Sequence, residues 1–145
     1  MLRPLSGTPR DVALLVGRVL LGVVLFAHGF QKVFIYGFAG TTGAFTKMGV
    51  PVPPAAAAYA SAVELVGGGL LILGAFTTIV SVLVVLDMLG AAFTTGHYAA
   101  IFVQSQGFEL EGTILVGALL LLVAGAGRYS IDHLLLSRRR APASA

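Results

Sequence analysis

The sequence predicts an all-α protein: a four-helix transmembrane bundle with both termini cytoplasmic and a short C-terminal helix at the membrane interface. Two observations predict this class. Of the 145 residues, 57% are hydrophobic and 10% are charged, whereas a soluble domain carries about 25% charged residues. Four apolar segments, at about 11–35, 55–75, 78–98 and 110–127, each approach the ~20 residues that a helix needs to cross a bilayer. The whole chain, 1–145, is therefore predicted to be a single integral membrane domain.

The first span begins with a typical helix-start pattern. In "TPRD" we expect Thr8 to be the N-cap, Pro9 the first helical residue, and Asp11 the acidic residue of a capping box. A cleaved signal peptide is the alternative, because Arg3 and Arg10 precede an apolar stretch. No cleavage site with two small residues follows that stretch, which favours a retained span.

The later spans have equally clear boundaries. The second segment opens after "GVPVPP", where Pro54 suits the first turn of a helix. Gly74 and Thr77 bracket a very short turn, so segments two and three should form a tight antiparallel hairpin. Span four ends at "GAGRYS", and Ser130 can cap a short helix, "IDHLLLSRRR", that suits the membrane interface. This basic tail, 128–145, is expected in the cytoplasm.

Basic residues predict the orientation. They precede span one and follow span four, at Arg3, Arg10, Arg128 and Arg138 to Arg140. The outer loops, 39–54 and 96–108, contain one lysine between them. Because cytoplasmic loops are enriched in Lys and Arg, both termini should lie in the cytoplasm. The formal charge of +3 comes largely from the tail, whose expected partner is anionic lipid and not nucleic acid.

Ionisable groups within apolar spans are rare and costly, which makes them candidates for function. Arg18, His28 and Lys32 fall within about an 80° arc of the first span, at 100° per residue. The carboxylates come from the other three spans: Glu64, Asp87, Glu109 and Glu111. We predict that these groups form one internal polar network, because paired charges are tolerated where isolated ones are not.

Specific pairings follow from the expected depth of each residue. Arg18 should reach Glu64 or Asp87 near the midplane. Lys32, with His28, should meet the span-four carboxylates nearer the outside. The network could bind a ligand and handle protons, or it could serve only to fix the register of the helices.

The residue types limit the chemistry. With no cysteine, the chain cannot hold a thiolate-ligated iron–sulfur cluster or perform thiol exchange by itself. No metal site is predicted. His28 and His97 could ligate a haem from one level, but two histidines are weak support for it, and His97 is better explained as an interfacial residue. His133 is expected to be solvated.

Several stretches resemble the DoxX family of small bacterial membrane proteins over nearly the whole chain. They are "GRVLLGVVLFAHGFQKVF", "GTTGAF" with "MGVPVPP", "VELVGGGLLILGAFT", "LDMLGAAF", "GFELEGTILVGALLLL" and "GRYSIDHLL". The resemblance implies a four-helix transmembrane bundle in the bacterial inner membrane. The family's motif positions correspond to Arg18, His28, Gly29, Lys32, Glu64, Asp87 and Glu109. Glu111 has no counterpart in that pattern.

The resemblance also implies a redox association, because relatives include a subunit of a thiosulfate–quinone oxidoreductase. The expected function is that of a membrane subunit of a redox system, linked to quinone or to thiol and oxidative-stress chemistry. A quinone is the candidate cofactor, and lipids and a partner subunit are the expected partners, in a number of copies left open. The alternatives are a non-catalytic scaffold or assembly factor and a small transporter. Family membership does not decide whether the chain is an enzyme.

Overall fold

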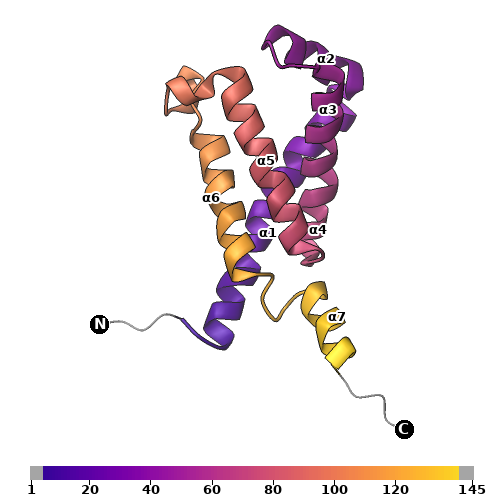
Figure 1. Cartoon of the computed structure of the whole chain (residues 1–145), viewed down its shortest axis with the longest axis vertical. Coiled ribbons are helices and arrows are strands. Elements are labelled where there is room, and N and C mark those ends of the chain that lie inside the picture. Colours follow the sequence, from indigo (N-terminus) through magenta and orange to yellow (C-terminus); the bar gives the residue numbers. More distant parts are fainter. Residues whose placement is uncertain (1–4, 141–145) are drawn as a thin grey trace.

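The computed structural model describes residues 5–140, which form helices and contain no strand (Figure 1). The prediction of an all-α protein is confirmed. The helices are α1 (Thr8–Phe30), α2 (Gly37–Lys47), α3 (Pro53–Ala62), α4 (Gly68–Leu73), α5 (Thr77–Thr95), α6 (Glu109–Ala124) and α7 (Ile131–Arg140). Two π-helical turns, η1 (Gln31–Ile35) and η2 (Val63–Gly67), and two 3-10 turns, η3 (His97–Ala99) and η4 (Val103–Ser105), complete the described elements.

Three continuous helical stretches are long and apolar enough to cross a membrane: Thr8–Ile35, Pro53–Leu73 and Thr77–Thr95. Each corresponds to a predicted span. The fourth predicted span is represented by α6, which has 16 residues and a length of about 24 Å at 1.5 Å per residue. A fourth crossing therefore stays a prediction, as does the orientation of the termini.

Close helix contacts hold the bundle together. Helix α1 packs along α4 and η2, while α6 packs against α5 and α1. A Cβ added to Gly68 would lie 2.5 Å from the Phe26 nitrogen and 2.8 Å from the Gly22 carbonyl oxygen. Only small residues permit this backbone approach, as in many membrane helix pairs. Leu25, Leu71 and Val84 are fully buried in the adjoining core.

The turn between α4 and α5 is as short as predicted. Gly74 takes the left-handed conformation, with φ of 69°, and α5 begins at Thr77. Asp132 caps this turn from α7: its two carboxylate oxygens accept hydrogen bonds from the backbone nitrogens of Phe76 and Thr77 at 2.7 and 2.8 Å. The predicted cap of α7 is confirmed, because Ser130 Oγ accepts a hydrogen bond from the His133 backbone nitrogen at 3.1 Å.

The predicted capping box at the start of α1 is wrong. Gly7 precedes the helix, Thr8 is already its first residue, and no side chain caps it. Asp11 is instead buried, and its Oδ1 accepts a hydrogen bond from the Arg128 backbone nitrogen at 3.2 Å. The linker before α7 contacts α1 at this point, and the Asp11 carboxylate supplies an acceptor for its backbone N–H group.

The predicted outer loop 39–54 is largely helical. Residues Gly37–Lys47 form α2, which packs on α3. Figure 1 shows α2 and the α5–α6 connection at one end of the molecule, and the start of α1 and α7 at the other. Helix α2 therefore covers the end of the bundle toward which His28 and Lys32 project.

Candidate functional site

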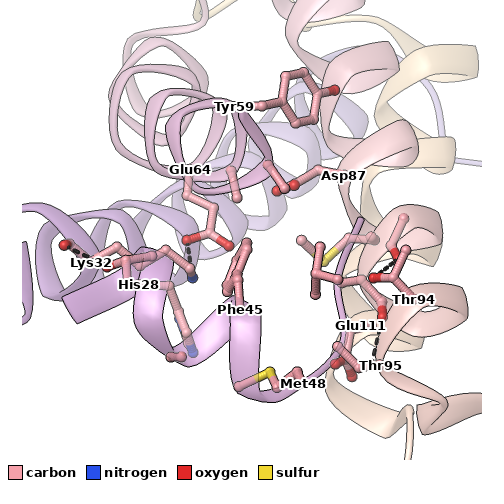
Figure 2. Close-up of a pocket in the computed structure, with 18 of the residues that line it drawn as sticks. His28, Lys32, Phe45, Met48, Tyr59, Glu64, Asp87, Thr94, Thr95 and Glu111 are labelled. Atoms are coloured by element: carbon pink, nitrogen blue, oxygen red, sulfur yellow. Dashed lines mark hydrogen bonds and ion pairs between the residues drawn. The ribbon is translucent and has the colours of Figure 1, made fainter. Parts of the chain in front are cut away.

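The two π-helical turns bring together one basic and one acidic residue. Lys32 lies in η1 and Glu64 in η2. Lys32 Nζ donates a hydrogen bond to Glu64 Oε2 at 2.5 Å, and the two side chains are 18% and 8% exposed (Figure 2). A π-helical turn widens the helix by one residue, and such turns are frequent at functional sites.

Gly29 makes this pairing possible. A Cβ at position 29 would overlap the backbone of Leu65 and lie 2.8 Å from the carbonyl carbon of Glu64. The missing side chain lets α1 touch the η2 backbone directly. The Lys32–Glu64 ion pair thus lies one helical turn beyond Gly29, where α1 and η2 come into direct backbone contact.

A cavity of about 440 Å³ lies beside the ion pair. This volume is within the range of sites for small molecules and cofactors. Most of its wall is apolar, from side chains such as Leu25, Phe45, Met48, Met88 and Ile114. Figure 2 shows polar side chains projecting from several helices around the space. Five of the predicted site residues line it: His28, Lys32, Glu64, Asp87 and Glu111.

Asp87 is the unpaired carboxylate of this wall. The residue is 7% exposed, and its Oδ2 has no hydrogen-bond partner in the part of the chain that the structure describes. Figure 2 shows its carboxyl group directed from α5 toward the side of the cavity that carries Glu64. A buried acceptor without a donor is costly, so this atom marks a place where a ligand could bind.

The histidines form different contacts. His28 Nδ1 lies 2.9 Å from the Val24 carbonyl oxygen of its own helix. His97 Nδ1 lies 2.7 Å from Glu111 Oε1 and joins the end of α5 to the start of α6. Both histidines line the cavity.

The predicted partner of Arg18 is wrong. Its guanidinium is fully buried and donates to the carbonyl oxygens of Leu71 at 3.0 Å and Tyr129 at 2.8 Å, not to Glu64 or Asp87. The last carbonyls of a helix have no helical partners and carry the negative end of its dipole, so they can hold a cation. Arg18 therefore fastens α1 to the end of α4 and to the α7 linker, outside the cavity.

The span-four carboxylates also differ from expectation. Lys32 pairs with Glu64 and not with Glu109 or Glu111. Glu111 faces the cavity, whereas Glu109 does not line it. Residues two apart on a helix point about 200° away from each other, so these two carboxylates cannot share one site. The expected single network is thus divided into separate contacts.

Sequence reasoning missed part of the wall. Thr41, Phe45 and Met48 come from the region expected to be a loop, and Tyr59 from the second predicted span, in which only Glu64 was a candidate. For His97 there was a signal, since it ends span three at the level where span four begins. Its pairing with Glu111 could have been anticipated from that.

Apolar helices of membrane-spanning length, arranged around a cavity with an internal ion pair, define a small helical membrane protein. The DoxX family model matches residues 13–97, and the chain belongs to this family. The family expected from the sequence motifs is confirmed.

Relatives cover most of the chain. "Inner membrane protein YqjF" of Escherichia coli is 38% identical over 86% of this chain and 93% of its own. "Uncharacterized membrane protein Rv3486" of Mycobacterium tuberculosis is 33% identical, over 86% and 82%. "Putative oxidoreductase CatD" of Bacillus subtilis is 31% identical, over 84% and 86%. No solved structure matches the chain significantly. The chain is a bacterial inner-membrane protein, as expected.

Proposed function

We propose that the protein is the membrane subunit of a quinone-linked redox system and that the cavity between α1, α2, α3, α5 and α6 is its quinone site. The observation that carries this proposal is the Asp87 carboxylate, buried and unpartnered at the wall of an otherwise apolar cavity of about 440 Å³. An apolar space with a few polar groups suits an amphipathic ring with a hydrocarbon tail.

Named residues fit the polar ring of a quinone. Lys32 would donate a hydrogen bond to an oxygen atom of the ring, and His28 and Asp87 would accept from its hydroxyl groups once it is reduced. Phe45, Met48 and Leu25 would contact its apolar part. A bound quinone supplies two-electron chemistry coupled to protons. The chain's own contribution is to orient the ring and to hold protons at the carboxylates and the imidazole. The relative named "Putative oxidoreductase CatD" agrees with this class of function.

The electrons must come from elsewhere. The chain has no cysteine, and the described residues contain no group of three or more His, Asp or Glu side chains that could hold a metal ion. The proposal therefore includes a partner protein or a small reductant as electron donor. This is the role of a membrane subunit, in which the quinone site and the donor belong to different chains.

We further propose that α6 is the fourth span and that both termini are cytoplasmic. Helix α6 packs along α5, and the starts of α1 and α7 lie at one end of the molecule (Figure 1). An even number of crossings requires this arrangement. The basic residues cluster at the same end, which favours the cytoplasm.

Copurification tests the quinone site. The protein is extracted from its native membrane, and the bound quinone is measured by chromatography per mole of protein. Lys32→Ala should lower this amount strongly, because hydrogen bonds to charged groups contribute about 1.5 to 3 kcal/mol, or at least tenfold in affinity. His28→Ala should lower it less, because a neutral ring contributes only about 1 kcal/mol. Lys47→Ala and His133→Ala are matched controls outside the cavity.

The outcomes separate the candidate functions. An unchanged amount of bound quinone in both cavity variants would contradict the proposed quinone site. Absence of quinone from the wild type, together with a stoichiometric partner retained by every variant, would favour the alternative of a scaffold or assembly factor.

A further inference from the structure

We propose, on the basis of this quinone site, that the cavity distinguishes the two redox states of its ligand. It binds the hydroquinone, which has two hydroxyl donors, more tightly than the quinone, which has acceptors alone. The reason lies in the polar groups that line the cavity: nearly all of their O–H and N–H groups already donate hydrogen bonds within the protein.

The hydroxyl groups are the first set. Of the five hydroxyls that line the cavity, four donate their one proton to a backbone carbonyl oxygen. The bonds are Thr41 to Lys32 at 2.9 Å, Tyr59 to Leu83 at 2.8 Å, Thr94 to Gly90 at 2.7 Å and Thr95 to Ala91 at 2.6 Å. A hydroxyl has one donor and two acceptor lone pairs. These four side chains can therefore offer a ligand acceptors alone.

The imidazoles are the second set. The carbonyl oxygen of Val24 can only accept, so the proton of the neutral His28 ring must lie on Nδ1. The other nitrogen, Nε2, is then an acceptor. The same reasoning applies to His97, whose Nδ1 faces the Glu111 carboxylate. Both rings therefore present an acceptor nitrogen.

The carboxylates are the third set. Asp87 Oδ2 is buried without a donor. Glu64 has one oxygen in the ion pair with Lys32, Glu111 has one in the hydrogen bond with His97, and each has a second oxygen besides. In its ionised form each of these carboxylates only accepts hydrogen bonds, and the expected preference refers to this form. A ligand hydroxyl directed at Asp87 would satisfy a carboxylate oxygen of the cavity wall that has no donor in the described part of the chain.

Donors are few by comparison. Lys32 Nζ keeps further N–H groups but is held by Glu64, and the Tyr36 hydroxyl lies on the exposed side of the wall. The two oxygens of a quinone therefore have only these two donor groups within the cavity, among the residues that the structure describes. The two hydroxyls of a hydroquinone can choose among many acceptors.

Equilibrium binding under anaerobic conditions tests this inference. The full chain in lipid nanodiscs is titrated with decylubiquinone, decylubiquinol and the dimethyl ether of decylubiquinol. Decylubiquinol should bind about tenfold more tightly than decylubiquinone, as two additional hydrogen bonds imply. The dimethyl ether has no donor and should lose this gain. Asp87→Leu should reduce the preference at least about threefold, whereas Lys47→Ala should leave it unchanged.

The other possible results contradict either the redox preference, its origin in hydrogen bonding, or the quinone site itself. Equal or tighter binding of decylubiquinone to the wild type keeps the quinone site and overturns the redox preference. A preference that the dimethyl ether shares, or that survives Asp87→Leu, overturns its origin in hydrogen bonding. Failure of all three ligands to bind overturns the quinone site itself. If Asp87→Leu does not fold, the dimethyl ether still tests, in the wild type alone, whether the preference arises from the hydroxyl donors of the ligand.

Discussion

Replacing Lys32 by methionine should destabilise the bundle because it leaves the Glu64 carboxylate buried without its cation. The Lys32 side chain is 18% exposed and that of Glu64 is 8% exposed, with 2.5 Å between Nζ and Oε2. Removal of one partner of a buried ion pair costs about 3 to 5 kcal/mol. Because both side chains keep some exposure, we expect the lower end, about 3 kcal/mol.

The double variant Lys32→Met/Glu64→Leu gives the sharper result. It removes both charges and leaves apolar side chains, so its free energy of unfolding should lie within about 1 kcal/mol of wild type. The coupling between the two positions should then be at least about 2 kcal/mol, because any cost of Glu64→Leu alone adds to it. The assay is unfolding in mixed detergent micelles, followed by circular dichroism. Lys47→Met, at an exposed lysine, is the control and should change stability by less than about 0.5 kcal/mol.

Additivity would refute this reasoning. If the double variant loses as much stability as the two single variants combined, Lys32 and Glu64 do not interact in the folded protein. The π-helical turns would then have some other origin, and the cavity would lose its fixed polar wall.

Three further predictions concern packing, capping and topology. Gly29→Ala should lower the free energy of unfolding by about 2 kcal/mol, since its Cβ overlaps the η2 backbone, whereas Gly17→Ala, which meets nothing, should be neutral or slightly stabilising in the same micelle assay. Asp132→Ala should cost about 1 to 2 kcal/mol because two backbone N–H groups lose their acceptor; equal stability in a thermal melt would contradict the cap. In the cysteine-free chain, Thr46→Cys should react with a membrane-impermeant maleimide in spheroplasts and Ser137→Cys should not, and the opposite pattern would invert the proposed topology.

Hydropathy predicted the helices well because a segment that crosses a membrane must be apolar and must satisfy its backbone hydrogen bonds internally. The tight turn at Gly74 and the cap at Ser130 followed from local residue types, and both are present. The outer segment with α2 was missed, because its glycines and threonines are typical of loops and its helix is stabilised by packing on α3. Tertiary contacts overrode local propensity there.

The candidate site was predicted in composition but not in its contacts. Helical periodicity placed His28 and Lys32 on one face, and both line the cavity. A regular helix of 3.6 residues per turn cannot anticipate the π-helical turns that direct Lys32 to Glu64. Arg18 was assigned to a carboxylate because charge balance suggested one, whereas the structure satisfies it with backbone carbonyls. Sequence reveals charges, but it does not show which carbonyls a helix end leaves open.

Photoaffinity labelling tests the central claim most directly, because it asks where a quinone ring lies. The protein in native-lipid nanodiscs is irradiated with an azido-quinone, and the labelled peptides are mapped by mass spectrometry. The account predicts labels on cavity residues in or next to α2 and α3, such as Phe45, Met48 and Tyr59, and their loss when decylubiquinol is added in excess. Labels confined to outward-facing residues such as Val123, unchanged by decylubiquinol, would contradict it.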